Sequence, residues 1–359
     1  MENFVVSARK YRPATFDQVV GQSAITRTLD NAIANNHLAQ AFLFCGPRGV
    51  GKTTCARILA RKINLDGVEN PEDEDFSFNI FELDAASNNS VEDIRNLIDQ
   101  VRIPPQTGKY RVYIIDEVHM LSQAAFNAFL KTLEEPPEYA IFILATTEKH
   151  KIIPTILSRC QIFDFKRIEI PDMVAQLDGI AKKEGVEAEQ DALHVIAQKA
   201  DGAMRDALSI FDQIVSFCGN NITYKDVIEN LNVLDYDYYF KLSDHLATGT
   251  LPQALLLFDE ILEHGFDGHN FINGLAEHFR NLLVCKDEAT LKLLLVGDNV
   301  KARYAEQAKS IEQEWLLYGL RVISKSDVQY KSSKNQRLLV ELTLMQLASA
   351  SKVLEKKKT

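Results

Sequence analysis

The chain has 359 residues, of which 46% are hydrophobic and 25% are charged, and its formal net charge is −10. This length allows two or three domains, and the composition is ordinary for a soluble globular protein. The negative charge excludes a surface coated in basic residues, but it permits nucleic-acid binding through a local patch or through helix N-termini. The sequence has no apolar run long enough to span a membrane and no signal-peptide pattern, so we expect a cytoplasmic protein without a membrane partner.

The five cysteines are scattered and form no CxxC pair. This spacing argues against a disulfide framework and against a zinc site. We therefore expect each cysteine to be a reduced thiol that packs as a small apolar side chain. They are Cys45, Cys55, Cys160, Cys218 and Cys285.

Short apolar segments alternate with longer helical patterns in the first part of the chain. Strands that are apolar throughout and separated by helices predict a parallel sheet that is covered on both faces. We therefore expect an α/β domain over residues 1–167. Its predicted strands cover residues 41–45, 79–84, 111–116, 140–147 and 161–165.

The patterns after this domain are helical only. We expect a small helical domain over residues 168–230 and an all-α domain with longer helices over residues 231–359. The last helix carries Leu338, Leu342 and Met345 on one stripe, with Leu339 and Leu347 beside it, which is wide for a surface helix. Two interpretations of this stripe stay open, namely packing within the domain and an interface between subunits.

The segment GPRGVGKT, residues 46–53, follows the first predicted strand and opens a helix. A GxxxxGK[ST] phosphate-binding loop requires this strand–loop–helix setting, because its glycines let successive backbone N–H groups surround a β-phosphate. Lys52 adds positive charge toward the β- and γ-phosphates, and the Thr53 hydroxyl suits a magnesium ligand. We therefore predict that the chain binds ATP and Mg²⁺. The predicted nucleotide-binding residues of this loop are Gly46, Pro47, Arg48, Gly49, Val50, Gly51, Lys52, Thr53 and Thr54.

The apolar strand RVYIID ends in Asp116, and Glu117 follows it. An acidic residue at this strand end lies beside the phosphate-binding loop in such sheets, so we predict that Asp116 holds the magnesium ion. Glu117 is then placed to orient or deprotonate the attacking water. The alternative is a pair of exposed carboxylates without a chemical role. We expect His119 to pack or to cap rather than to catalyse.

Two further polar positions have candidate catalytic roles. Thr146 or Thr147, at the end of the fourth predicted strand, is placed to hydrogen-bond the γ-phosphate or the attacking water. Arg205 lies in the first turn of a helix after a glycine, and we expect it to reach back to the nucleotide. The alternative for Arg205 is a surface salt bridge with Asp206 or Asp201.

These motifs, together with KYRPATFDQVVGQ, ELDAASNNSVEDIR, VYIIDEVHMLSQAAFNAFLKTLEEPP, FILATTEKHKIIPTILSRC and GAMRDALSIFDQ, closely resemble the gamma/tau family of bacterial DNA polymerase III subunits. This family supplies the AAA+ ATPase motor of the sliding-clamp loader. The resemblance is close from residue 1 to about 230 and continues more weakly to the end. The combination of motifs is far more specific than the phosphate-binding loop alone.

The resemblance implies an architecture, an activity and a set of partners. It implies a P-loop AAA+ sheet domain (1–167), a helical lid domain with the sensor 2 motif (168–230) and a helical collar (231–359). It implies a pentameric ring with delta, delta-prime and other gamma/tau copies, in which ATP drives loading of the beta sliding clamp onto primed-template DNA. The residues that it implies for the adenine pocket are Tyr11, Arg12, Pro13, Val20 and Gly21.

The stretch TILSRCQIFDF leads into the fifth predicted strand. Cys160 has no base beside it, so we expect a packed thiol, and Ser158 is typical of a cap or a turn. By resemblance, Arg159 is an arginine finger that reaches the γ-phosphate bound by the neighbouring subunit, because a planar and permanently charged guanidinium suits that role. The alternative for Arg159 is a local salt bridge with Asp164.

A second helix start is a candidate contact for DNA. Ser90 and Asp93 fit a capping box at this helix start. Free N–H groups, asparagine amides and nearby lysines are suited to DNA phosphates, which predicts binding that depends on shape and salt rather than on base sequence. The predicted DNA-contacting residues are Asn88, Asn89, Ser90, Lys109 and Lys151.

The chain departs from the family pattern in two places. The family commonly carries a four-cysteine zinc module after the first helix, but residues 65–79 contain neither cysteine nor histidine, so we predict no zinc site. The tau form has a long C-terminal extension that binds the replicative helicase and the polymerase. This chain stops at the collar, and we expect it to be a gamma-like portion or a truncated form that does not make those contacts by itself.

Two other functions stay open at this point. One is a scaffold subunit whose ATP site is structural and silent, although intact Lys52, Asp116 and Glu117 argue against it. The other is a different AAA+ DNA motor, such as a branch-migration helicase. The LSRC motif and a long helical C-terminal domain without a winged-helix pattern argue against that class.

Overall fold

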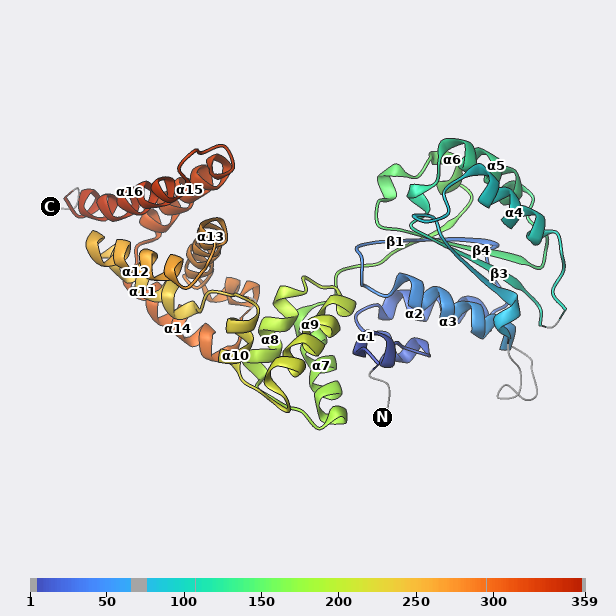
Figure 1. Cartoon of the computed structure of the whole chain (residues 1–359), viewed down its shortest axis with the longest axis horizontal. Helices are drawn as coiled ribbons and strands as arrows, with labels where there is room; N and C mark the ends of the chain where they lie inside the picture. The colour runs from blue at the N-terminus through green and yellow to red at the C-terminus, as the bar shows by residue number, and fades with distance from the viewer. Residues whose placement is uncertain (1–4, 66–75, 107, 295, 357–359) are drawn as a thin grey trace. The chain divides into compact units, whose positions relative to one another are not determined.

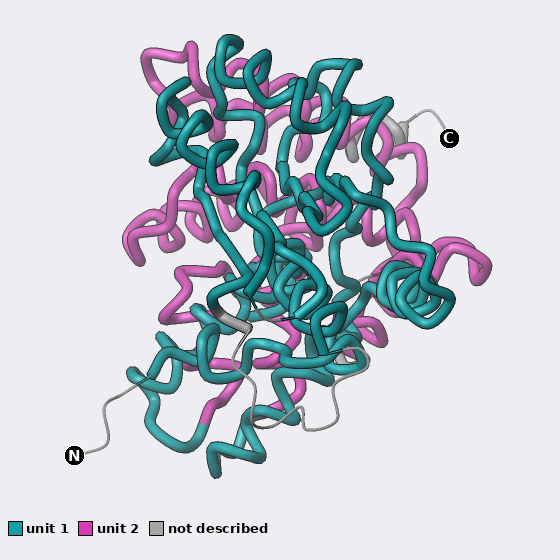
Figure 2. The backbone as a smooth tube through the Cα atoms, turned by 90° about the vertical axis from the view of Figure 1, so that its right-hand side faces the viewer, with its two compact units in different colours: residues 1–188, 196–221 teal, residues 189–195, 222–359 magenta. Residues whose placement is uncertain are grey.

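The computed structural model describes residues 5–65, 76–106, 108–294 and 296–356. The chain forms two compact units, which Figure 2 shows in different colours. Unit 1 comprises residues 1–188 and 196–221, and unit 2 comprises residues 189–195 and 222–359. The predicted division into three domains stays a prediction.

Unit 1 contains a five-stranded parallel sheet, as predicted. Its strands are β1 (Ala41–Cys45), β2 (Ile80–Asp84), β3 (Arg111–Asp116), β4 (Ala140–Thr146) and β5 (Gln161–Asp164). The strand order is β2-β3-β4-β1-β5, so the strand before the phosphate-binding loop lies between β4 and β5. The strand ends agree closely with the sequence expectation, because each strand coincides with an apolar run that ends in a polar residue, a glycine or a turn.

Five helices cover the two faces of this sheet. They are α2 (Ser23–Ala34), α3 (Lys52–Leu65), α4 (Val91–Val101), α5 (Gln123–Glu134) and α6 (Pro154–Leu157). In Figure 1, α2 and α3 lie on one face, and α4, α5 and α6 lie on the other. Successive strand residues point to opposite faces. Phe42 and Phe44 therefore pack in the core under α2 and α3, whereas Leu43 packs in the core under α4 and α5.

The carboxyl ends of the parallel strands meet at one edge of the sheet. The register pairs Asp84 with Asp116 and Cys45 with Thr146. The phosphate-binding loop leaves β1 at this same edge. Ligand sites of open parallel sheets lie outside such an edge, so the fold gathers the candidate residues where a nucleotide is expected.

The other helical elements of unit 1 are α1 (Ser7–Lys10), η1 (Phe16–Gln18), η2 (Phe76–Asn79), η3 (Val118–Met120), η4 (Lys149–Lys151), α7 (Ile170–Glu184) and α9 (Met204–Cys218). Helices α7 and α9 hold the N-terminal segment in place. The backbone N–H of Ser7 donates to Asp212 Oδ2 of α9 over 2.7 Å, and Lys10 pairs with Glu184 of α7 at 2.6 Å. The segment that carries the predicted adenine-pocket residues is thereby anchored.

Unit 2 is built from helices, as expected for residues 231–359. Its helices are α10 (Tyr224–Asn230), α11 (Tyr236–Ala247), α12 (Leu251–Glu263), α13 (Gly268–Val284), η5 (Glu288–Leu293), α14 (Asp298–Ser310), α15 (Gln313–Tyr330) and α16 (Gln336–Lys356). Helix α8 (Gln190–Lys199) contributes residues to both units. The stretch that was expected to be helical only, residues 168–230, also holds the two-residue strands β6 (Glu187–Ala188) and β7 (Asn221–Ile222).

Helix α16 packs into the core of unit 2 through a face other than the predicted stripe. Val340 and Leu344 are buried there, whereas Leu338 and Leu342 are each 45% exposed. Leu347 is buried in the same core and Leu339 packs against it, so packing within the unit accounts for these two residues but not for Leu338 and Leu342. Among the described residues, no helix combines the length and apolar character that crossing a membrane requires.

Candidate functional site

The phosphate-binding loop has the backbone that its glycines were expected to allow. Gly46 has φ +149° and Gly49 has φ +77°, a range that side-chain-bearing residues rarely adopt. A Cβ on Gly46 would lie 2.5 Å from the carbonyl oxygen of Phe165, and one on Gly49 would lie 2.9 Å from the Cβ of Ala203. Only glycine fits at these two positions, and α3 begins directly after the loop, at Lys52.

Lys52 is held inside this loop. Its side chain is buried, and Nζ donates to the carbonyl oxygens of Gly46 and Pro47 over 2.8 and 2.7 Å. Burial lowers the pKa of Lys52, while Glu117 and Asp116 oppose that shift. The ammonium group is therefore close to two carboxylates, which favour its charged form against the effect of burial.

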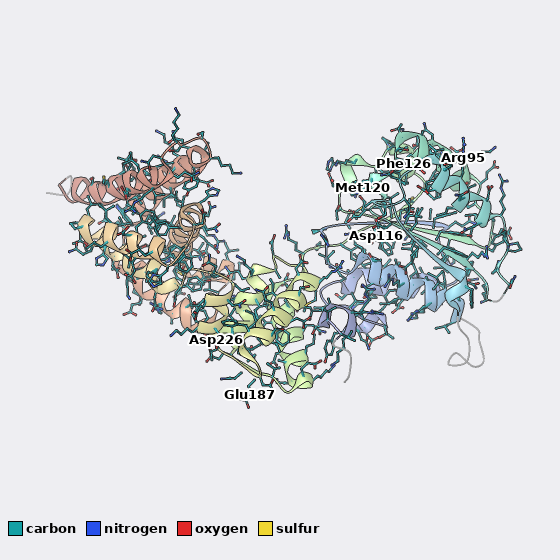
Figure 3. All side chains as sticks on the ribbon, viewed as in Figure 1. Arg95, Asp116, Met120, Phe126, Glu187 and Asp226 are labelled. Atoms are coloured by element: carbon teal, nitrogen blue, oxygen red, sulfur yellow. The ribbon has the colours of Figure 1, made fainter. Side chains whose placement is uncertain are left out.

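Thr53 and Asp116 meet across the site. The Thr53 hydroxyl donates to Asp116 Oδ2 over 2.7 Å, although the two residues are far apart in the sequence. Figure 3 shows Asp116 at the edge of the sheet, while Phe126 lies in the helical layer of α4 and α5. A hydroxyl and a carboxylate oxygen are the hard ligands that Mg²⁺ takes, and Mg²⁺ binds few protein groups beside nucleotide phosphates. The residues present therefore fit a magnesium–nucleotide complex.

A cavity of about 440 Å³ lies against the loop, and unit 1 alone lines it. Most of the predicted nucleotide-site residues line this cavity: Tyr11, Arg12, Pro13, Val20, Arg48, Gly49, Val50, Gly51, Lys52, Thr53, Thr54, Asp116, Glu117 and Arg205. Four predicted residues do not line it: Gly21, Gly46, Pro47 and Thr146. Sequence reasoning missed other lining residues: Ala8, Gln18, Val19, Asp84, Ala86, Ile168, Gln176, Met204 and Leu208.

Tyr11 enters the cavity from the N-terminal segment. Its hydroxyl donates to Glu184, which also pairs with Lys10. Partial burial and Glu184 raise the pKa of Tyr11, so the phenol stays protonated and neutral near pH 7. The aromatic face and the neighbouring Pro13 and Val20 supply apolar surface for a base. The adenine-pocket assignment stays a prediction.

Glu117 stands on strained backbone. Its φ of 47° is left-handed, which is uncommon for a residue with a side chain. Oε2 of Glu117 accepts from Thr147 N and Thr147 Oγ1 over 3.2 and 3.0 Å. Thr146 is fully buried, and its Oγ1 accepts from the backbone N–H of Glu148 over 3.0 Å. Of the two threonines, Thr147 therefore contacts the candidate base, and the phosphate contact of Thr146 stays a prediction.

Arg205 lines the cavity from α9. Its side chain is exposed, and within the described part of the chain it forms no ion pair. Its backbone N–H donates to the Gly49 carbonyl over 3.4 Å. Asp201, one of the alternative partners, pairs with Arg167 instead. The geometry thus leaves the Arg205 guanidinium available to a ligand in the cavity.

Arg159 lies outside the cavity of its own chain. Its Nη2 pairs with Glu134 Oε1 at 2.6 Å, and Nη1 donates to the Thr155 carbonyl over 2.7 Å. The alternative of a salt bridge between Arg159 and Asp164 is wrong, because Asp164 forms an ion pair with Lys149 at 2.9 Å. Burial raises the pKa of Cys160 to about 12, so the neighbouring thiol is protonated and unreactive.

The residues predicted to contact DNA lie at two opposite ends of the sheet strands. Ser90 and Asp93 form the predicted capping box at the start of α4. Lys151 pairs with Glu148 at 2.9 Å, after the carboxyl end of β4. Lys109 precedes β3, so it lies at the opposite edge of the sheet, about 20 Å away for a strand of this length. The expectation that Lys109 adds charge beside Ser90 and Lys151 is therefore wrong, because the chain reverses through α4 before it reaches Lys109.

The zinc prediction falls on a segment that is mostly outside the described residues, 66–75 among them. The absence of zinc stays a prediction. Elsewhere, in the described ranges, no cluster of three or more His, Cys, Asp or Glu side chains could hold a metal ion.

Three family models match successive parts of the chain. Residues 21–169 match the model described as DNA polymerase III, delta subunit. Residues 172–220 match the DNA polymerase III clamp loader subunit, ATPase lid domain. Residues 222–359 match DNA polymerase III subunits gamma and tau domain III.

Relatives match nearly the whole chain. DNA polymerase III subunit tau of Bacillus subtilis is 40% identical, over 96% of this chain and 63% of that protein. DNA polymerase III subunit gamma of Buchnera aphidicola is 34% identical, over 96% of this chain and 97% of that protein. Among solved structures, the RuvB Holliday junction branch migration motor of Thermotoga maritima aligns with a TM-score of 0.48 at 21% identity, over 66% of this chain and 79% of that one.

The chain therefore spans less than two thirds of the longer tau relatives and almost all of a gamma relative. The matches confirm the predicted fold class, which is a P-loop AAA+ parallel-sheet domain followed by a helical lid and an all-α domain. The chain belongs to the gamma/tau family of DNA polymerase III clamp-loader subunits.

Proposed function

We propose that this chain is an ATP-hydrolysing motor subunit of a clamp loader, and that it drives loading of the beta sliding clamp onto primed-template DNA. The observation that carries the proposal is the meeting of Thr53 and Asp116 beside Lys52, with Glu117 lining the same cavity. A nucleotide site that does not hydrolyse ATP would not need a general base such as Glu117 in this cavity. This function predicts a cytoplasmic location, where the chromosome is replicated.

Each residue of the cavity has a distinct part in the proposed reaction. Backbone N–H groups of the loop and Lys52 bind the β- and γ-phosphates. Thr53 and Asp116 would hold Mg²⁺, which would neutralise charge on the phosphates. Glu117 orients the attacking water and takes its proton, while Arg205 binds phosphate from α9. Tyr11, Arg12, Pro13, Val20 and Gly21 surround the adenine in this proposal.

The site is completed by a second subunit. Arg159 lies outside its own cavity and is about one third exposed, which suits a residue that reaches the γ-phosphate bound next door. The proposed partners are the delta and delta-prime subunits, other gamma/tau copies, the beta clamp and primed DNA. The proposed domains are an ATPase core over 1–167, a lid over 168–230 and a collar over 231–359.

Steady-state ATP hydrolysis by the ring reconstituted with delta and delta-prime subunits tests this proposal. We expect the wild-type ring to hydrolyse ATP and the Lys52→Ala ring to lose that activity, because the phosphates lose their cation. A matched control is Lys62→Ala, which removes an exposed lysine of the same helix that pairs with Asp30. A wild-type ring that does not hydrolyse ATP would instead support the silent scaffold.

We also propose that the start of α4 and the η4 turn contact DNA phosphates. Asn89 adjoins the N-cap of α4, and Lys151 lies at the same edge of the sheet after β4. We expect Asn89→Ala with Lys151→Ala to reduce DNA stimulation of ATP hydrolysis and the dependence of DNA binding on salt. Lys109→Ala is the control, since Lys109 lies at the other edge. Unchanged DNA stimulation in the double variant would rule out this contact.

A further inference from the structure

The carboxylate of Glu117 is held through one of its two oxygens. Oε2 accepts both hydrogen bonds from Thr147 and lies 3.4 Å from His119 Nδ1. Within the described part of the chain, Oε1 has no hydrogen-bond partner, and the residue lines the cavity. One oxygen is thus anchored while the other is available to a water molecule.

His119 is the buried member of this arrangement, with a side chain only 6% exposed. Its Nδ1 makes a hydrogen bond of 3.0 Å with Thr146 Oγ1, and its Nε2 lies 3.3 Å from Glu148 Oε1. The ring therefore stands between two carboxylates, one of which is the candidate base. Packing alone does not require a polar ring here, and a buried polar group that has partners on both sides fixes their geometry.

Glu148 is anchored from its solvent side as well. It pairs with Lys151 at 2.9 Å, and His150 lies 3.5 Å from its other oxygen. Lys151 is the main cause that lowers the pKa of Glu148, so this carboxylate is charged. Its backbone N–H donates to the same Thr146 Oγ1 that His119 contacts. The His119 ring therefore contacts both the Glu117 carboxylate and Glu148 of the segment 148–151.

We propose that His119 is a positioning residue, which holds the Glu117 carboxylate against Thr147 and ties its position to Glu148. The inference rests on the proposed function, because it takes Glu117 as the base for ATP hydrolysis. The two ring nitrogens of His119 face different carboxylates, with Nδ1 3.4 Å from Glu117 and Nε2 3.3 Å from Glu148. A displacement of Glu148 therefore moves the ring and alters the contact between His119 Nδ1 and the Glu117 carboxylate. Through this ring, the segment after β4 influences the position of the candidate base.

The expected effect falls on the chemical step rather than on ATP binding. His119 does not line the cavity, so its loss leaves the contacts to the nucleotide in place. A misplacement of a catalytic group by about 1 Å costs about 100-fold in rate, and a general base contributes about 100- to 10,000-fold. We expect His119→Ala to lower kcat about 10- to 100-fold in the reconstituted ring, with the KM for ATP unchanged.

Two conservative variants separate the contacts of the ring. His119→Asn keeps a polar atom near the position of Nδ1, and His119→Gln keeps one near the position of Nε2. We expect His119→Asn to recover most of kcat, because it keeps the contact near Glu117. We expect His119→Gln to behave like His119→Ala. His37→Ala, at an exposed histidine before β1, is the control and should leave kcat unchanged. Thermal melting and binding of a fluorescent ATP analogue show that each variant is folded.

A double-mutant cycle with Glu117→Gln supplies the decisive readout. If His119 acts through Glu117, then His119→Ala lowers the residual rate of the Glu117→Gln ring by less than about twofold. Equal losses in both backgrounds would show a structural role and overturn the inference, as would a folded His119→Ala ring with wild-type kcat. If Glu117→Gln itself keeps wild-type hydrolysis, the proposed role of Glu117 fails, which is a different result from a failure of His119 alone.

Discussion

The strand-end edge of unit 1 and the core of unit 2 both hold polar side chains, but they use them differently. At the edge of unit 1, Glu117 stands on left-handed backbone, and its Oε1 has no partner among the described residues. In unit 2, His278 is 1% exposed, and both of its ring nitrogens are satisfied, by Tyr304 at 2.9 Å and by Gln307 at 3.1 Å.

The same contrast extends to their neighbours. Gln307 in unit 2 donates onward to the Phe240 carbonyl and to Asp244, each over 2.8 Å, so this network is closed within the protein. The edge of unit 1 keeps strain and spare hydrogen-bonding capacity, which are typical of functional sites. Unsatisfied hydrogen-bonding groups, rather than polarity alone, therefore distinguish the candidate site in unit 1 from the polar cluster in unit 2.

The largest expected effect tests whether chemistry depends on an exposed arginine of unit 1. We expect Arg159→Ala to slow ATP hydrolysis in the ring by about 10³- to 10⁵-fold, because the transition state loses a charge supplied from the neighbouring subunit. ATP affinity and thermal stability should change little, since its pair with Glu134 is exposed. Single-turnover hydrolysis and binding of an ATP analogue measure the two effects.

Arg57→Ala is the matched control, because Arg57 is also an exposed arginine paired with a glutamate, Glu82. It should leave hydrolysis unchanged. Equal loss of ATP binding and hydrolysis in Arg159→Ala would mean that the residue serves its own subunit's site or the fold.

A glycine substitution tests the strain at the edge of unit 1. In Gly46→Ala the new Cβ would meet the Phe165 carbonyl at 2.5 Å on a positive-φ backbone, so we expect a loss of about 1–3 kcal/mol in stability and weaker ATP binding. Gly179→Ala, in the open interior of α7, should instead gain about 0.5–1 kcal/mol. Urea denaturation measures both changes. Equal effects of the two substitutions would show that the loop is not strained.

Much of unit 1 follows from local sequence. The predicted strands coincide with apolar runs, and the GxxxxGK[ST] loop and the Ser90 capping box depend on neighbouring residues alone. The partners of individual side chains could not be predicted from local sequence, because they depend on tertiary packing. Arg159 pairs with Glu134 rather than Asp164, and Lys109 lies at the far edge because α4 returns the chain across the sheet.

The contacts of His119 do not follow from the sequence for the same reason. A histidine after DEV is compatible with simple packing, and only the fold brings Thr146 and Glu148 of a different strand end to its two nitrogens. In unit 2 the helical pattern predicted an all-α domain, but it did not predict that the face of α16 with Leu338 and Leu342 stays exposed. Helical periodicity identifies an apolar stripe on a helix, but it does not identify the element that packs against that stripe.

The smallest expected effect concerns the closed network of unit 2. Burial lowers the pKa of His278 to about 3, so the folded protein keeps this ring neutral where the unfolded chain binds a proton below about pH 6.5. The unfolded state then binds more protons, and stability falls as the pH drops from about 6.5 toward 3, by at most about 1.4 kcal/mol per pH unit. Fluorescence of Trp315, the only tryptophan, reports unfolding of this unit in urea.

His278→Gln removes the titration while it keeps a polar side chain in the network. Its stability should depend less on pH in this range than that of the wild type. Identical dependence in the two proteins would mean that His278 is not held neutral, and the contrast between the units would lose its clearest example.

In the proposed function, ATP hydrolysis at the edge of unit 1 drives a clamp loader. The most direct test of this function is loading of the beta clamp onto primed circular DNA by the ring reconstituted with delta and delta-prime subunits. We predict ATP-dependent loading by the wild-type ring and none by the Lys52→Ala ring. Equal loading by the two rings, or no loading by a wild-type ring that hydrolyses ATP, would contradict the account.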